Sequence, residues 1–289
     1  MKPTISLTGV IDMHVHTAPD ICRRTCNDLE LTEAALRAGA RAVVLKGHHG
    51  STVARAALCN AYNRAAFDGN AFVMYGGLVL NGEAGGLNPK AVQTALEMGA
   101  KVIWLPTADA ENDRRKHGKP GGIRITDGRG VPLPELRRIF ALIREYDAVL
   151  ATGHISPEEI RCAADCARDI GVQKIVVSHP EHWVVDLSLE GQQELVSDYG
   201  VVLERCLMQP LANGQWVSNA ARNLEAIRQL GAESTVLSTG CGSPAFPPWE
   251  KAMRQHLQFM ADHGVSTQDL HRMTRTTPAR LLGLVDTLE

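Results

Sequence analysis

Eight short runs of hydrophobic, mostly β-branched residues recur along the chain, and a longer segment with helical periodicity follows each of them. The runs are apolar almost throughout and do not alternate with polar residues, which is typical of strands buried on both faces in a parallel sheet. The predicted strands are residues 10–15, 41–45, 72–80, 101–105, 148–151, 174–177, 201–203 and 235–237.

The segments between these runs carry the signals of helix ends. Residues 32–38 are followed by Gly39, and a glycine readily adopts the left-handed conformation that closes a helix. Ser156 and Pro157 suit the N-cap and the first turn of a helix that closes near Gly171.

Eight strand-and-helix units in succession predict an α/β fold, a (β/α)8 TIM barrel that covers residues 1–289 as a single domain. An open, doubly wound sheet is the alternative. No glycine-rich dinucleotide motif follows any predicted strand, which disfavours a nucleotide-binding version of that alternative.

The spacing of the units is uneven after the fourth strand, where residues 107–132 form an insertion. Its first half is charged and rich in glycine, and its second half has the pattern of a small hairpin that turns at Asp127 and Gly128. An insertion after a barrel strand lies on the face that carries active sites, so we expect either a lid or a mobile surface loop.

The composition of the chain limits the classes of molecule that we expect it to bind. The chain has 289 residues with 30 Lys and Arg against 32 Asp and Glu, a net charge of −2, which argues against nucleic-acid binding. No apolar run approaches the roughly 18 residues that span a bilayer, and residues 1–7 contain no secretory signal pattern. Seven scattered cysteines are typical of reduced thiols. We therefore expect a cytoplasmic protein with a small-molecule substrate and no membrane partner, and homo-oligomerisation stays open.

Histidines stand at the ends of three predicted strands. His14 and His16 end the first strand, and a period of two places both imidazoles on the same side of it. His154 follows the fifth strand and His179 the sixth. Strand ends converge at the mouth of a barrel, and neutral imidazole is the commonest nitrogen ligand of zinc-like ions. These four histidines therefore predict a metal site.

The remaining histidines have weaker signals. His48, His49 and His182 lie in loops beside the predicted site, where they could contact a substrate. A polar helical region near the carboxyl terminus contains three others, which we expect at the surface: His256, His263 and His271.

Taken in order, these motifs resemble the amidohydrolase superfamily. The residues that carry the resemblance are 11–16 (IDMHVH), Gly153-His154, Ser178-His179, Ser238-Thr239 with Gly242 and Pro244, and 277–284 at the end of the chain. The resemblance implies a (β/α)8 barrel that holds one or two divalent ions, usually zinc, and hydrolyses amide or ester bonds, often in cyclic compounds. It implies that His14 and His16 bind the more buried ion and that His154 and His179 bind a second ion or the substrate.

The sequence departs from the superfamily pattern at the eighth strand. Superfamily members typically carry a metal-binding aspartate directly after the Ser-Thr pair, and Gly240 stands there in this chain. Glycine has no side chain that could act as ligand or base. The candidate replacements are two carboxylates, Glu204 and Glu83, and the thiol of Cys241.

A second departure concerns the bridging ligand of binuclear members. They usually carry a carboxylated lysine or a glutamate on the fourth strand, where this chain has Pro106 and Thr107. Lys46, at the end of the second strand, could bridge metals as a carbamate or stabilise developing negative charge as a cation. The alternative for Lys46 is a side chain that extends along the barrel rim into water.

The sequence thus predicts a metal-dependent hydrolase of the amidohydrolase type that acts on a small polar substrate. We expect Lys46 and Glu204 to assist the attacking water and Thr107, His182 and Arg124 to contact the substrate. Two alternatives stay open: a metal-dependent decarboxylase or other lyase on the same barrel, and a metal-binding barrel whose catalysis is impaired by Gly240.

Overall fold

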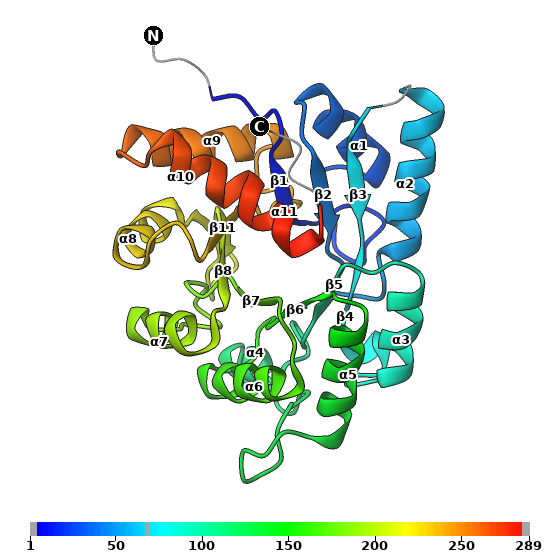
Figure 1. Cartoon of the computed structure of the whole chain (residues 1–289), viewed down its shortest axis with the longest axis vertical. Coiled ribbons are helices and arrows are strands. Elements are labelled where there is room, and N and C mark those ends of the chain that lie inside the picture. Colours follow the sequence, from blue (N-terminus) through cyan, green and yellow to red (C-terminus); the bar gives the residue numbers. More distant parts are fainter. Residues whose placement is uncertain (1–4, 68–69, 285–289) are drawn as a thin grey trace. The chain divides into compact units, whose positions relative to one another are not determined.

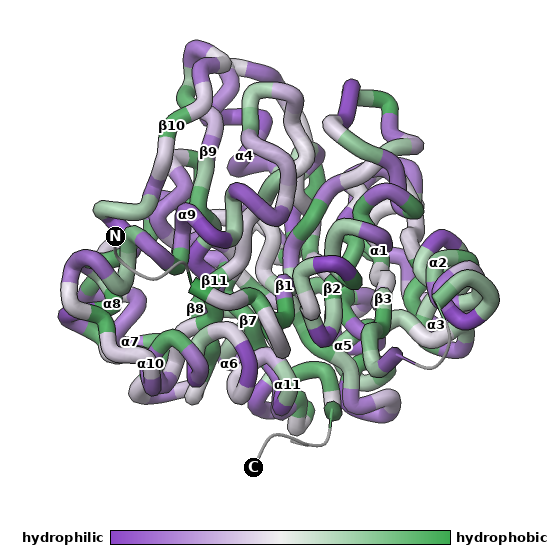
Figure 2. The backbone as a smooth tube through the Cα atoms, turned by 90° about the horizontal axis from the view of Figure 1, so that it is seen from above, coloured by the Kyte–Doolittle hydropathy of each residue, from purple (hydrophilic) through white to green (hydrophobic). Residues whose placement is uncertain are grey.

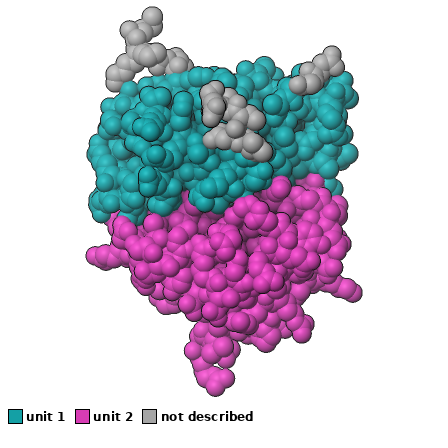
Figure 3. Space-filling model, viewed as in Figure 1, with its two compact units in different colours: residues 1–46, 54–76, 205–289 teal, residues 47–53, 77–204 magenta. Residues whose placement is uncertain are grey.

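The chain folds into two compact units in a computed structural model that describes residues 5–67 and 70–284. Unit 1 comprises residues 1–46, 54–76 and 205–289, and unit 2 comprises residues 47–53 and 77–204 (Figure 3). The outermost residues of the predicted 1–289 domain, 1–4 and 285–289, lie outside the described residues, as do 68–69.

Parallel strands form the centre of unit 1. The strands β1 (Ile11–Val15), β2 (Ala42–Leu45) and β3 (Val73–Tyr75) pair in that order (Figure 1). The segment after β11 (Thr235–Ser238) runs beside β1, since the amide of Gly240 donates to the carbonyl of His14. A short antiparallel hairpin is built from β9 (Met208–Pro210) and β10 (Trp216–Ser218).

Unit 2 contains a second run of parallel strands in chain order. They are β4 (Gly77–Val79), β5 (Val102–Trp104), β6 (Val149–Ala151), β7 (Ile175–Ser178) and the start of β8 (Val202–Cys206). Most residues of the parallel strands are buried, and most of these are hydrophobic, as the apolar runs predicted (Figure 2).

All eight predicted strands are confirmed, but one of them is divided into two strands. The run at residues 72–80 is two strands, because β3 pairs with β2 and β4 pairs with β5. At the start of β4 the backbone passes very close to its neighbour: a side chain on Gly77 would collide with the carbonyl oxygen of Val102. The hairpin of β9 and β10 was not predicted, because its strands are short and include polar residues.

Helices follow the strands in both units. Unit 1 contains α1 (Asp28–Arg37), nearly all of α2 (Val53–Ala66), α8 (Ala220–Leu230), α9 (Trp249–Asp262), α10 (Thr267–His271), a π-helical turn (Arg272–Thr276) and α11 (Thr277–Leu282). Unit 2 contains a 3₁₀ turn (Gly82–Ala84), α3 (Pro89–Glu97), α4 (Glu111–Lys116), α5 (Pro134–Glu145), α6 (Pro157–Ile170) and α7 (Leu189–Tyr199). In unit 2, α5 packs between α3 and α6, and α7 packs on α6. Among the described residues, no helix is both long and apolar enough to cross a membrane.

The predicted helix-end signals act as expected. Ser156 caps α6 in a capping box with Glu159, and Gly171 closes the helix in the left-handed conformation with φ 93°. Gly39, just after α1, also has a positive φ of 74°.

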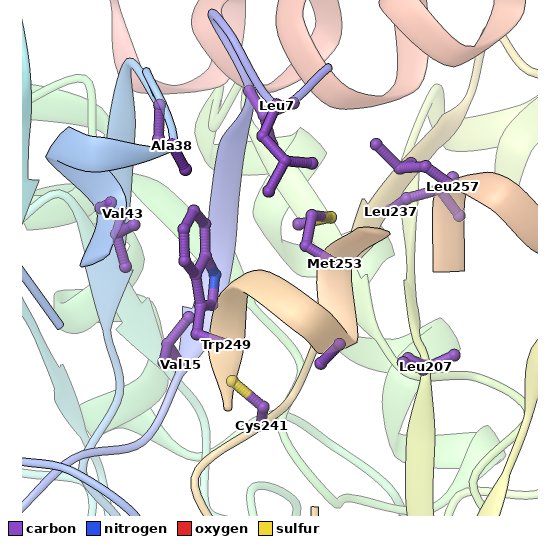
Figure 4. Close-up of a cluster of buried hydrophobic side chains, with 14 of the residues drawn as sticks. Leu7, Val15, Ala38, Val43, Leu207, Leu237, Cys241, Trp249, Met253 and Leu257 are labelled. Carbon is purple, nitrogen blue, oxygen red and sulfur yellow. The ribbon is translucent and has the colours of Figure 1, made fainter. Parts of the chain in front are cut away.

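The hydrophobic core of unit 1 is built around Trp249 at the start of α9. Its indole lies against Val15 and Val43 of the adjacent strands, and Met253 lies one turn further along the helix (Figure 4). His256 belongs to the same buried face, at the helical spacing 249, 253, 256, 260. The surface position expected for His256 is therefore wrong, whereas His263 and His271 are exposed.

The insertion at residues 107–132 is more ordered than its composition suggested. Its charged half forms α4, in which Asn112 and Asp113 are buried. The predicted hairpin is confirmed: Thr126 and Pro132 form an antiparallel bridge, and the amide of Asp127 donates to the carbonyl of Val131 at 2.8 Å.

Candidate active site

The two histidines at the end of β1 face each other in unit 1. His14 and His16 are buried, and their Nε2 atoms lie 3.2 Å apart. Two nitrogens that each lie about 2.0–2.1 Å from one tetrahedral zinc ion are about 3.3 Å apart. The spacing of this pair therefore suits two ligands of a single ion.

A cysteine that the sequence did not single out lies beside this pair. The thiol of Cys206, at the end of β8, is buried, and its Sγ lies 3.5 Å from Nδ1 of His14. His14 and Cys206 offer ligand atoms within 4.8 Å of each other. The sequence predicted a strand at residues 201–203. The observed strand β8 continues to Cys206, so this sulfur lies at the strand end.

The two predicted catalytic side chains are both buried. Glu204 lies on β8, in register with Ser178 of β7, and is 2% exposed. Since side chains alternate along a strand, Glu204 and Cys206 occupy the same face of β8. Lys46 follows β2, its amide donates to the carbonyl of Val15, and it is also 2% exposed. This burial excludes the alternative of a lysine extended into water.

Asp12, near the start of β1, anchors this strand, a role that sequence reasoning missed. Its carboxylate accepts hydrogen bonds from the Thr239 hydroxyl at 2.7 Å, from Nε1 of Trp249 at 2.9 Å and from the His14 amide at 3.1 Å. Complete burial raises the pKa of Asp12 to about 6, although these donors partly offset the effect. The side chain thus ties β1 to the segment after β11 and to α9.

Gly240 and Cys241 have different roles from those considered at the sequence level. Gly240 has a φ of +61°, and a Cβ built on it would lie 3.2 Å from Cβ of Cys206 and 3.3 Å from its Sγ. Cys241 packs in the hydrophobic core beside Trp249 (Figure 4), where burial raises the pKa of its thiol. Among the described residues, the group of possible metal ligands at His14 contains Cys206 and not Cys241.

Unit 2 has its own cluster of imidazoles. His154 and His179 follow β6 and β7, and their ring centroids lie 4.9 Å apart. The ring of His182 lies 5.1 Å from that of His179 and 5.6 Å from that of His154, and His48 lies 5.8 Å from His154. His154, His179 and His182 are buried. The structure thus brings the predicted ligands of unit 2 together with the predicted substrate contact His182.

The insertion supplies a carboxylate to this cluster. Oδ2 of Asp113 lies 2.6 Å from Nδ1 of His154, and its Oδ1 lies 2.9 Å from Nδ1 of His117. The neighbouring Asn112 donates to the carbonyls of His154 at 3.0 Å and Val184 at 2.9 Å. Sequence reasoning missed both residues because a charged, glycine-rich segment predicts a solvated loop.

Thr107, which follows β5 in the chain, lies at the centre of a network of polar side chains. Its hydroxyl accepts from Nδ2 of Asn81 at 2.8 Å and lies 2.8 Å from Nδ1 of His48. Its amide donates to Oδ1 of Asn81 at 2.8 Å. The network orients His48 toward its neighbours in unit 2.

Two other candidate residues are exposed in unit 2. Arg124, predicted to contact the substrate, forms a surface ion pair with Glu111 at 3.4 Å. Glu83, one of the candidate carboxylates, pairs with His49 at 2.7 Å, and this hydrogen bond lowers the pKa of Glu83.

Several enzymes of known structure have a similar fold. An amidohydrolase from Pseudomonas aeruginosa aligns over 95% of both chains with a TM-score of 0.66 and 13% identity. The organophosphorus hydrolase from Deinococcus radiodurans aligns over 96% of this chain and 93% of its own, with a TM-score of 0.59 and 17% identity. The 2,6-dihydroxybenzoate decarboxylase from Rhizobium aligns over 96% and 99%, with a TM-score of 0.52 and 13% identity.

At these identities the likeness shows the fold alone, which is the α/β TIM barrel that the sequence predicted. A family model named DUF6282, family of unknown function, matches residues 9–204. The chain therefore belongs to this family. The search of curated protein sequences found no match.

Proposed function

We propose that this protein is a metal-dependent hydrolase of the amidohydrolase type that cleaves an amide or ester bond, cyclic or open, in a small polar substrate. The observation that carries the proposal is the pair of buried imidazoles, His14 and His16, with Nε2 atoms 3.2 Å apart at a strand end of this fold. A divalent ion bound there would lower the pKa of a water ligand towards 7 and polarise a scissile carbonyl.

The chain's own residues supply the remaining chemistry in this proposal. Glu204 accepts the proton of the attacking water in this proposal. Its carboxylate is buried and lies on β8, the strand that ends at Cys206. Lys46 stabilises the negative charge that develops on the carbonyl oxygen, or holds a carbamate, since its side chain is withdrawn from water.

The imidazoles of unit 2 have a role of their own in this proposal. His154 and His179 hold a second ion or the substrate, and Asp113 fixes the ring of His154 by accepting from Nδ1. His182 binds the substrate beside them. Thr107 acts through His48, and Arg124 attracts a negatively charged group to the mouth of the site.

Zinc is the ion we propose, because imidazole and thiol donors suit a borderline-soft cation. One tightly held ion and two ions are both consistent with the donor set. A cytoplasmic location and a small-molecule substrate remain part of the proposal.

A decarboxylase is the second candidate. The structural likeness to 2,6-dihydroxybenzoate decarboxylase covers 96% of this chain, and Gly240 removes the residue that serves hydrolysis in the superfamily pattern. Decarboxylation requires a sink for an electron pair rather than a base for water. Related decarboxylases also tend to carry the aspartate, so Gly240 is weak support for this candidate.

Metal analysis of the purified protein tests the proposal. We expect bound zinc in the native protein and its loss in His14→Ala and His16→Ala, whereas the exposed His263→Ala retains it. Activity is then screened on lactones, esters, amides and phosphotriesters, and carboxylic acids are screened for release of carbon dioxide. Hydrolysis that zinc restores after chelation supports the proposal, and release of carbon dioxide alone supports the second candidate. The absence of metal binding by the native protein would overturn both.

A further inference from the structure

Unit 1 contains a cavity of about 460 Å³ that none of the candidate site residues lines. The segment before β1, the helices α9 and α10 and the π-helical turn border it. Val10, Leu257 and Leu270 are buried apolar residues of its wall. Val10 directly precedes β1, so the cavity lies at the opposite end of this strand from His14 and His16. Pockets for small molecules have volumes of about 300–1,000 Å³ and mostly apolar walls with a few polar groups.

One of the polar groups on the wall is the guanidinium of Arg275, in the π-helical turn. Its Nε is buried and finds no hydrogen-bond acceptor within residues 5–67 and 70–284. Arg272 of the same turn, by contrast, pairs with Asp269 at 3.5 Å and Glu233 at 3.7 Å. A buried charged donor without an acceptor is costly, and π-helical turns are frequent at functional sites. Arg275 is therefore a candidate ligand contact.

The other titratable groups on the wall limit the charge of the ligand. Partial burial and the charge of Arg275 lower the pKa of His271, so this imidazole is neutral at pH 7. Asp262 is exposed, and its carboxylate accepts from Nε2 of Gln258 at 3.1 Å. Among the described residues that line the cavity, Arg275 thus supplies the positive charge, and Asp262 disfavours a multiply charged anion. The wall suits one negative charge and an apolar body.

From this cavity and its unpaired guanidinium we propose that unit 1 binds a small carboxylic acid with a single negative charge and an apolar body. The carboxylate pairs with Arg275, since the planar guanidinium matches the geometry of a carboxylate. The apolar body lies against Leu257 and Leu270. This ligand site is additional to the proposed hydrolase site and does not depend on a metal ion.

The experiment titrates octanoate into the full-length protein by isothermal calorimetry. Acetate, which lacks the apolar body, and 1-octanol, which lacks the charge, are the reference ligands. We expect octanoate to bind at least about tenfold more tightly than either. Arg275→Gln should weaken octanoate about tenfold and leave 1-octanol unchanged. Arg272→Gln makes the same change of charge in the same turn but does not line the cavity, so it is the matched control and should bind octanoate as the native protein does.

A carboxylate bound to a metal ion is the competing explanation, so the titration is repeated with His14→Ala, which should retain octanoate binding. Ala261→Phe fills the cavity and should abolish it, and circular dichroism establishes that each variant is folded. Binding that is lost in His14→Ala and retained in Arg275→Gln would overturn the assignment. Equal affinities for octanoate and 1-octanol, or no binding of octanoate, would also overturn it. None of these results bears on the proposed hydrolase, which metal analysis tests separately.

Discussion

Asp113, from the insertion after β5, holds Nδ1 of His154 at 2.6 Å in the imidazole cluster of unit 2. A carboxylate in this position fixes both the tautomer and the orientation of the ring, so that Nε2 is directed to an ion or a substrate. The same carboxylate contacts His117, whose ring packs against Trp183 with centroids 4.9 Å apart. The insertion thus helps to fix the ring of His154 in the imidazole cluster.

Asp113→Asn should lower kcat/KM by about 10- to 100-fold, because the amide cannot stabilise the required tautomer as the carboxylate does. Steady-state kinetics on the substrate found in the screen measure the effect. His117→Ala removes the other partner of Asp113 and is the control, for which we expect a smaller loss. Equal losses in the two variants would contradict a specific role for the contact with His154.

Gly240→Asp should destabilise the protein by about 1–3 kcal/mol, the usual cost of a strained backbone conformation, with an added clash against Cys206. Urea unfolding monitored by circular dichroism gives the free energy of unfolding. Adding Cys206→Ala in the same chain should recover part of the loss, since it removes Sγ from the crowded space. A single Gly240→Asp variant as stable as the native protein would refute this packing argument.

The contribution of His256 to stability should decrease in acid. Complete burial lowers the pKa of His256 to about 4, whereas the unfolded histidine titrates near 6.5. The unfolded state therefore binds more protons between pH 6.5 and 4, and the free energy of unfolding decreases as the pH falls through this window. Going from pH 7 to pH 5 should cost about 2 kcal/mol from this residue.

Guanidinium unfolding at the two pH values tests this effect in the native protein and in His256→Gln. The glutamine does not titrate, so the difference between pH 7 and pH 5 should shrink by about the same 2 kcal/mol. The exposed His263→Gln is the control and should behave as the native protein does. An unchanged pH difference in His256→Gln would show that the histidine is not the source.

Trp249→Phe should destabilise unit 1 by about 1–3 kcal/mol, because it removes the indole donor from the buried carboxylate of Asp12. Thermal unfolding measures the loss. Trp216→Phe offers a matched exchange, since that indole packs on Phe246 with ring centroids 4.6 Å apart. A greater loss in Trp216→Phe than in Trp249→Phe would contradict the anchoring role of the hydrogen bond.

The candidate site was only partly predictable from the sequence. The His14 and His16 pair followed from strand period alone, because two imidazoles at alternate positions share one side of a strand. The burial of Asp113 could not be predicted, because its neighbours in the sequence are charged. Composition alone does not distinguish a solvated helix from one whose first turn is buried. Cys206 was missed because its strand extends three residues beyond the apolar run.

The order of strands and helices and the helix ends at Ser156 and Gly171 are determined by the local pattern of residues. These features depend on neighbours in the chain, where periodicity and capping preferences operate. The packing of Cys206 into the space at Gly240, the burial of His256 and the contact of Asp113 with His154 were decided only by the tertiary structure. Each of them joins residues more than 30 positions apart, and no local preference encodes which distant side chain will fill a given space.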